Sequence, residues 1–220
     1  MTVAVLTAQS GFAALAEHLE NASADSGTHV VTLLGLGELT DPLAADVLTA
    51  LDDCPVPVIA GLSGAVNASG LFVAAACDIV VADVDATISL ADVDQDQLGY
   101  IARLLRTLPG ALVRRMLLLG EPVSAEEIGR LGAVQIVTGE SVKSGVERLA
   151  RELDTKSPTA LRLLKHSMVT TSTLPVEAGV DVESIYSRIA LASPDGRESA
   201  QAFLEKRAPV WAAHGTEGQV

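Results

Sequence analysis

Two kinds of segment alternate along the first half of the chain. Residues 29–34 and 56–62 are continuous apolar runs, which are typical of strands buried on both faces. Between them, residues 42–51 have helical periodicity, with Asp41 placed as an N-cap and Pro42 at the first helical position. This alternation predicts an α/β fold.

The same patterns predict the other elements, and they make the second half of the chain mainly helical. Ser124 to Glu127 has the capping-box spacing that marks the start of a helix. Strands are expected at residues 3–7, 29–34, 56–62, 79–82, 87–90 and 132–137. Helices are expected at residues 11–22, 42–51, 71–77, 101–108, 111–119, 141–153, 158–169, 176–192 and 194–207.

Composition narrows the class of protein. The 220 residues fit one domain, and 49% hydrophobic residues can form a sizeable core. Aromatic residues make up only 3%, so that core must consist of Ala, Val, Leu and Ile. The net charge of -13 argues against a nucleic-acid partner, because a phosphate backbone requires a basic surface. We interpret the acid excess mainly as a contribution to solubility.

Other features argue against metal sites, disulfides and membrane insertion. Cys54 and Cys77 lie in or beside apolar segments, which favours buried thiols over a disulfide or a metal pair. No Cys/His cluster has the spacing of zinc ligands. The apolar runs are too short to span a bilayer, and the first residues do not resemble a signal peptide. These features predict a cytoplasmic protein with no membrane contact.

Residues 67–70, Asn-Ala-Ser-Gly, form the first candidate for chemistry. They join a buried strand to an apolar helix, and unpaired N–H groups at a helix start can stabilise a developing oxyanion. Small residues at such a turn also allow a ligand to approach the backbone closely. The alternative is a tight connection that needs small residues only for packing.

The sequence around this turn resembles the enoyl-CoA hydratase (crotonase) superfamily. Residues 68–74 align without a gap with the family's Gly-Gly-Gly-Leu-Glu-Leu-Ala-like stretch, and Cys77-Asp78 and Ala91-Asp92 follow at the family's positions. Further similar segments occur in the same order at 116–120, 123–127, 131–134, 156–161 and 203–211. The resemblance covers about residues 55 to 211.

The resemblance implies a fold and a substrate class. The fold is a crotonase-like spiral of ββα units over residues 1–145, with a helical region at 146–220 that packs on it within one structural domain. In the family such helices assemble homotrimers or dimers of trimers. The substrate is an acyl-CoA or an acyl-carrier-protein thioester, so coenzyme A enters as part of the substrate and no separate cofactor or metal is expected.

The resemblance also implies site residues. The Ser69 N–H is one oxyanion donor, and Ala68 and Gly70 line the substrate beside it. The second donor in the family comes from a loop after an earlier strand. Here that loop is short, so either Gly35 to Gly37 supplies the donor or it has been lost.

The family's two carboxylate positions differ from the hydratase pattern. The first holds Phe72, which cannot transfer a proton but can line the substrate. The second holds Asp92, which suits abstraction and return of an α-proton. Asp92, Asp94 and Asp96 share one loop, so Asp92 is alternatively a solvated surface acid.

Three residues of the helical region have weaker assignments. Phe203 and Lys206 match positions that contact the nucleotide end of CoA across a subunit interface in the family. The alternative for Phe203 is packing between helices, and the alternative for Lys206 is a solvated surface charge. His166 lies where some decarboxylating relatives use a histidine, but the spacing does not match, which favours a surface histidine.

Two functions follow from these residues. One is an enzyme that stabilises a thioester enolate, of the isomerase or decarboxylase type rather than a hydratase with two glutamates. The other is a non-catalytic acyl-thioester-binding or accessory protein that retains the fold.

Overall fold

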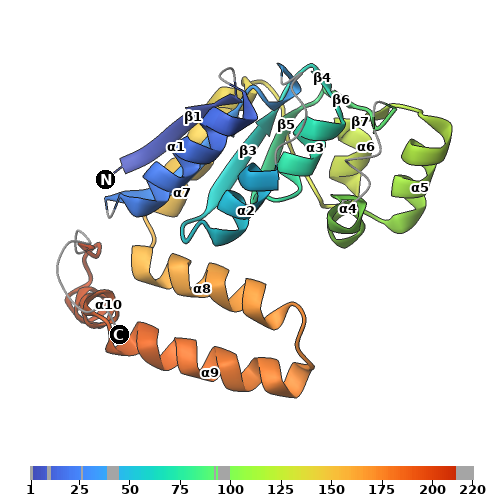
Figure 1. Ribbon diagram of the computed structural model, residues 1–220. Coiled ribbons are helices and arrows are strands. Elements are labelled where there is room, and N and C mark those ends of the chain that lie inside the picture. Colours follow the sequence, from blue (N-terminus) through green and yellow to red (C-terminus); the bar gives the residue numbers. More distant parts are fainter. Residues whose placement is uncertain are drawn as a thin grey trace.

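The computed structural model describes residues 2–8, 11–25, 27–38, 45–91, 93 and 100–211. Its main element is a parallel sheet (Figure 1). The strand order is β1 (Thr2–Thr7), β2 (Thr28–Leu34), β3 (Val58–Leu62), β5 (Ile79–Asp83) and β8 (Gln135–Val137). The central strands are the continuous apolar runs of the sequence, because helices cover both of their faces.

A smaller sheet lies beside the first one. It contains β4 (Ala65–Val66), β6 (Thr87–Ile88) and β7 (Val123–Ser124), with β4 parallel to β6 and β6 antiparallel to β7. The chain passes from β3 to β4 and again from β5 to β6, so each time it leaves the main sheet and enters the small one. This repetition is the spiral expected from the sequence.

Three helices cover the main sheet. Helices α1 (Phe12–Ala24) and α2 (Ala45–Asp53) pack together on one side, where Val31 and Leu33 of β2 join their core. Helix α7 (Val142–Asp154) covers the other side, where Val30 lies in a second buried cluster. Burying one Val or Leu side chain fully stabilises the fold by about 1.5–3 kcal/mol. The expected N-cap Asp41 and Pro42 lie outside the described residues.

Four short helices and one 3-10 turn surround the small sheet. They are η2 (Leu36–Glu38), α3 (Ala68–Ala74), α4 (Ile101–Thr107), α5 (Gly110–Leu119) and α6 (Ala125–Arg130). The Ser124 hydroxyl accepts from the Glu127 N–H, 3.1 Å away, as the capping-box pattern predicts. The Glu127 carboxylate accepts from Arg115 at 2.7 Å. Of the two reciprocal hydrogen bonds of a capping box, the structure therefore shows the one from the Glu127 N–H to Ser124.

The strand predicted at 132–137 is shorter than expected. Gly132 has a φ of 79°, and its N–H donates to Gly129 O at the end of α6. A positive φ suits glycine at a helix end, and it turns the chain before a strand can begin. The strand prediction is therefore wrong for residues 132–134, and β8 starts at Gln135.

Helices α8 (Pro158–Thr171), α9 (Val176–Ala192) and α10 (Pro194–Glu205) stand away from the sheets (Figure 1). The boundary expected between residues 145 and 146 falls inside α7, which packs on the main sheet. The Arg162 side chain ties α8 to β2 by donating to the Thr28 carbonyl oxygen at 3.3 Å. The Ser157 hydroxyl, just before α8, donates to the Asp195 carboxylate of α10 at 2.7 Å. This bond ties α10 to α8, and we call α8, α9 and α10 the helical group.

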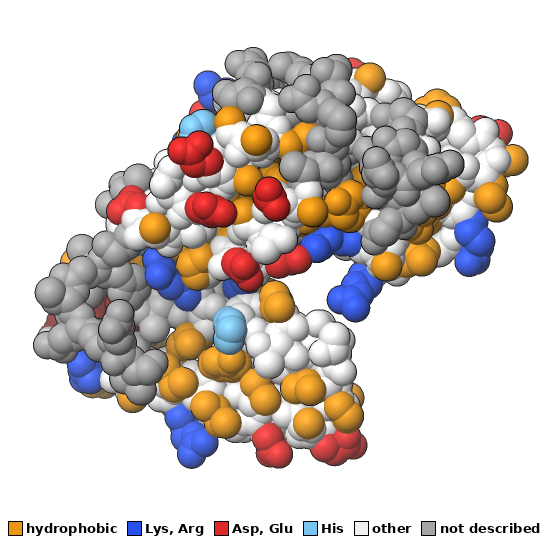
Figure 2. Space-filling view, in the orientation of Figure 1, with side chains coloured by type: hydrophobic (Ala, Val, Ile, Leu, Met, Phe, Trp, Pro, Cys, Tyr) orange, Lys and Arg blue, Asp and Glu red, His pale blue; other side chains and the backbone are white. Residues whose placement is uncertain are grey.

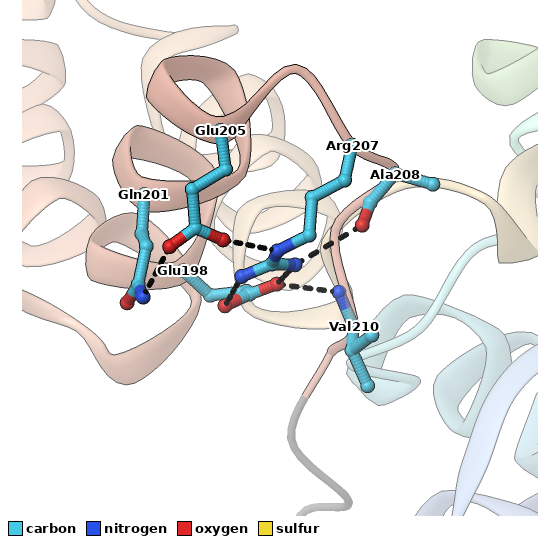
Figure 3. A network of polar contacts seen from close by, with 6 residues as sticks. All are labelled: Glu198, Gln201, Glu205, Arg207, Ala208 and Val210. Atoms are coloured by element: carbon cyan, nitrogen blue, oxygen red, sulfur yellow. Dashed lines mark hydrogen bonds and ion pairs between the residues drawn. The ribbon is translucent and has the colours of Figure 1, made fainter.

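The segment after α10 folds back on the chain. Arg207 forms ion pairs with Glu198 and Glu205 of α10, and the Val210 N–H donates to Glu198 at 2.7 Å (Figure 3). Trp211 Nε1 then donates to the carbonyl oxygen of Thr155, between α7 and α8, at 3.0 Å. These contacts place the end of α10 next to the junction where the helical group leaves the sheet.

The helical group exposes many apolar side chains, and Figure 2 shows them over the lobe formed by α8 and α9. They include Leu164, Met168, Val176, Val180, Ile185, Ile189, Phe203 and Leu204. Among the described residues, none of the helices combines the length and apolar character needed to cross a bilayer.

Candidate active site

The turn at residues 67–70 is the first turn of a helix. The Asn67 side chain accepts from the Gly70 N–H at 2.8 Å and so caps α3, which begins at Ala68. The prediction that this helix starts at Leu71 is therefore wrong by three residues. Ala68 and Ser69 are buried, with Ser69 4% exposed. The candidate donor Ser69 thus lies in the first turn of a helix packed in the core.

The segment from Gly35 to Gly37 lies directly against that first turn. A Cβ on Gly70 would come within 2.5 Å of the Leu36 carbonyl oxygen. A Cβ on Gly37 would come within 2.5 Å of the Ala65 carbonyl oxygen. Glycine is required at both places because backbone approaches backbone. Gly35 has a φ of 77°, which turns the chain from β2 into this contact. The two segments expected to hold the donors are therefore neighbours.

Phe72 lies one turn of helix further along α3. It is fully buried, and its ring centroid is 5.7 Å from that of Tyr100, with the planes tilted by 60°. Such a tilted arrangement is favourable for two aromatic rings. Tyr100, just before α4, is half-buried and separates Phe72 from solvent on that side. No proton-transferring group therefore occupies position 72.

Asp92 lies outside the described residues, as do Asp94 and Asp96. The residue before it is placed: the Ala91 N–H donates to the Ser89 hydroxyl at 3.2 Å. The ends of β6 and α5 are close here, since a Cβ on Gly120 would lie 3.6 Å from the Ala91 Cβ. The role of Asp92 stays a prediction.

Cys77 and Asp78, which follow α3, have structural contacts. The Asp78 carboxylate accepts from the Val58 N–H at 2.7 Å and from Lys165 of α8 at 2.8 Å. Burial raises the pKa of the Cys77 thiol, and the neighbouring Asp78 charge adds to this effect. The Cys77 thiol is therefore protonated at neutral pH and is a poor nucleophile. Cys54 and Cys77 both remain thiols, and within the described parts of the chain no cluster of side chains is arranged to hold a metal ion.

Phe203 lies on α10 and Lys206 directly follows it, and Figure 1 places α10 far from α3. Phe203 is 83% exposed, so packing within its own chain does not explain it. Lys206 is exposed and has a φ of 54°, at the end of the helix. One copy of the chain therefore does not bring these residues to the first turn of α3. His166 is at the surface, as predicted, with its ring edge-to-face with Tyr186.

Sequence reasoning missed one cluster near the candidate site. Tyr100, Arg103 and Arg106 recur every third residue along α4 and line a groove between α4, α2 and α8. Arg103 binds Asp52 of α2 through two hydrogen bonds, of 2.8 and 2.6 Å, and these raise the pKa of the Arg103 guanidinium. The spacing was visible in the sequence, but nothing there indicated that α2 and α8 lie opposite this face.

Comparison with known proteins decides the family. The sequence model of the enoyl-CoA hydratase/isomerase family matches residues 15–214. The chain belongs to the enoyl-CoA hydratase/isomerase (crotonase) family. This match and the spiral described above confirm the fold and the family predicted from the sequence.

Relatives of known structure or function agree with this membership. The carnitinyl-CoA dehydratase of Salmonella typhi is 36% identical over 173 residues, which are 74% of this chain and 66% of that protein. The chain thus matches just under two thirds of the relative's length. A crystal structure of an enoyl-CoA hydratase from Polaromonas sp. JS666 has a TM-score of 0.83 and 25% identity, with 96% of each chain covered. An enoyl-CoA hydratase/carnithine racemase from Magnetospirillum magneticum has a TM-score of 0.81 and 26% identity, covering 96% of this chain and 92% of that one.

Proposed function

We propose that this crotonase-family protein binds an acyl thioester of coenzyme A or of a carrier protein and stabilises its enolate. The Ser69 N–H and an N–H of residues 35–37 would point at the thioester carbonyl oxygen. The observation that carries the proposal is the backbone contact at Gly70, which holds residues 35–37 against the first turn of α3. Each donor fixed in this way can lower the free energy of the transition state by about 3 kcal/mol.

The reaction we propose is an isomerisation or a decarboxylation. Hydration by the family's carboxylate pair needs an acid or base at position 72, where the buried Phe72 has none. Asp92 would take the α-proton of the thioester and return it to another carbon, or protonate the α-carbon after CO₂ leaves. In both cases the electron pair rests on the carbonyl oxygen between the two steps.

The second candidate is an accessory protein that binds the thioester without reaction. The ring contact between Phe72 and Tyr100 favours it, because two aromatic side chains fill the place of the first carboxylate. The groove next to Tyr100 can still hold an acyl group.

We also propose that the protein works as a homotrimer or a dimer of trimers. Its support is the exposed apolar surface of α8 and α9 and the exposure of Phe203 at the end of α10. In such an assembly Phe203 and Lys206 would contact the nucleotide end of a CoA bound to the neighbouring copy.

Hydrogen exchange at the α-carbon tests the catalytic proposal. The protein is incubated with butyryl-CoA in D₂O, and deuterium at the α-carbon is followed by NMR. We expect exchange with the native protein, loss of exchange with Asp92→Ala, and native exchange with the loop control Asp94→Ala. Binding of the thioester without exchange would favour the accessory function. Equal exchange in the Asp92 and Asp94 variants would remove Asp92 from the mechanism.

A crystal soaked with the same thioester tests the geometry. The expected result is a carbonyl oxygen about 3 Å from the Ser69 nitrogen and from a backbone nitrogen of residues 35–37. A carbonyl oxygen bound elsewhere would contradict the proposed donors.

A further inference from the structure

A groove of about 600 Å³ opens between α2, α4 and the end of α8. Figure 2 shows the hollow between the sheet body and the α8–α9 lobe, with Lys or Arg side chains on its upper wall. Apolar contacts come from Leu48 of α2 and Val169 of α8, and the polar wall is the face of α4. A groove of this size with a few placed polar groups is typical of a small-molecule site.

Tyr100 stands between one end of this groove and the candidate active site. Tyr100 lines the groove, and its ring contacts that of Phe72. Phe72 is three residues after Ser69 on α3. An acyl group that starts at the first turn of α3 would therefore enter the groove by passing Tyr100 and would then follow α4.

The groove carries positive charge in a strongly acidic protein. Its charged side chains are Arg103, Arg106 and Asp52, so its lining has a net charge of one positive, whereas the whole chain has a net charge of -13. Asp52 is already bound by Arg103 through two hydrogen bonds. Within the described residues, Arg106 has no ion-pair partner, and its side chain is exposed to the groove. Its charge is therefore available to a ligand.

The spacing along α4 gives the position of this charge. Arg106 is six residues from Tyr100, which is about 9 Å along a helix. An acyl group that passes Tyr100 and follows α4 thus meets the Arg106 guanidinium only when its chain is long. Guanidinium binds carboxylate through paired hydrogen bonds and prefers it to an uncharged end group.

We propose that the groove selects acyl groups with a carboxylate at the end far from the thioester, bound by Arg106. The selected substrates are thioesters of dicarboxylic acids, with the methylene groups on Leu48 and Val169 and the free carboxylate at Arg106. This inference rests on the proposed thioester binding and names its substrate class. Asp52 contributes by holding Arg103 in place and leaving Arg106 as the group that binds the carboxylate.

The test compares two thioesters with acyl chains of equal length. Dodecanedioyl-CoA ends in a carboxylate, and dodecanoyl-CoA ends in a methyl group. Their dissociation constants are measured by isothermal titration calorimetry with the native protein, with Arg106→Gln, and with the control Arg114→Gln. Arg114 is an exposed arginine of α5 outside the groove lining.

We expect the native protein and Arg114→Gln to bind dodecanedioyl-CoA about tenfold more tightly than dodecanoyl-CoA. Arg106→Gln should lose this preference through weaker binding of dodecanedioyl-CoA, with the binding of dodecanoyl-CoA unchanged. Equal binding of both thioesters by the native protein, or a preference that persists in Arg106→Gln, overturns the inference and leaves the proposed thioester binding intact. Binding of neither thioester overturns both.

Discussion

The ammonium group of Lys165 lies 2.8 Å from the Asp78 carboxylate and 2.9 Å from the Val56 carbonyl oxygen. Lys165 belongs to α8, and Asp78 lies between α3 and β5, so the contact joins the helical group to the sheet body. The same carboxylate oxygen accepts from the Val58 N–H at the start of β3. One buried lysine thus fixes α8 to the starts of the inner strands β3 and β5.

Lys165→Met should destabilise the fold strongly. Methionine keeps the aliphatic volume but leaves Asp78 without its cation, and removing one partner of a buried pair costs about 3 kcal/mol or more. Asp78 is 23% exposed, so we expect the low end of this range. The free energy of unfolding is measured in urea by circular dichroism.

Lys143→Met is the matched control, because Lys143 is an exposed lysine on α7. It should change the free energy of unfolding by less than about 0.5 kcal/mol. In the double variant with Asp78→Asn, Lys165→Met should cost less than it does alone, since no uncompensated charge remains. Equal stability of the Lys165 and Lys143 variants would show that the pair contributes little.

Gly70→Ala should weaken both the fold and thioester binding. The new Cβ would lie 2.5 Å from the Leu36 carbonyl oxygen, so η2 must move away from α3. Overpacking of this kind costs about 1–3 kcal/mol. The movement also separates the two proposed donors, so we expect a higher dissociation constant for butyryl-CoA by calorimetry.

Gly179→Ala controls for the loss of glycine in a helix. A Cβ there meets Thr171 at an ordinary 3.6 Å, and alanine in a helix interior is up to about 1 kcal/mol better than glycine. This variant should be as stable as the native protein or more so, with unchanged binding. Native binding by Gly70→Ala would contradict the role of the backbone contact.

Phe72→Glu should not restore hydration. The Phe72 side chain is fully buried, so a carboxyl group at this position would be removed from water. We therefore expect the free energy of unfolding to fall by more than about 3 kcal/mol. Phe72→Leu keeps an apolar side chain and should cost about 1 kcal/mol. Unfolding in urea and hydration of crotonyl-CoA are measured for both variants. A stable Phe72→Glu protein that hydrates crotonyl-CoA would mean that position 72 opens to the substrate.

The Glu198–Arg207 pair should be lost in acid. Hydrogen bonds from Arg207 and from the Val210 N–H lower the pKa of Glu198 from 4.5 to about 2. A lowered pKa means that the carboxylate stabilises the fold above pH 4.5, and that this contribution is lost as the pH falls to about 2. Carboxyl resonances followed by NMR should report this titration.

Arg207→Gln should raise the pKa of Glu198 toward its ordinary value, so that the contribution is lost at a higher pH. Arg188→Gln, at an exposed arginine of α9, should leave the pKa of Glu198 unchanged. The same Glu198 pKa in the Arg207 variant and the native protein would exclude Arg207 as the cause.

The sequence predicted most of the fold because its signals are local. The apolar runs at 29–34 and 56–62 became the buried strands β2 and β3, and Ser124 capped α6 as its spacing indicated. Strands β4 and β7 were missed because two residues carry no readable periodicity. The start of α3 was misplaced because the small residues after Asn67 resemble a turn.

The site was harder to predict because it depends on distant contacts. The sequence marked Gly37 and Gly70 as small, but the carbonyl groups against which they pack come from other segments. The sequence analysis did not single out Arg106, since only the fold brings α2 and α8 to face α4.

The place of Trp211 has a practical consequence for following the protein in solution. It is the single tryptophan of the chain, and its indole donates to Thr155, where the helical group leaves the sheet. Its fluorescence therefore reports detachment of the end of the chain, whereas circular dichroism reports the helices of the whole molecule. If the fluorescence changes at a lower denaturant concentration than the circular dichroism, the end of the chain detaches before the rest unfolds, and the protein is not a two-state folder.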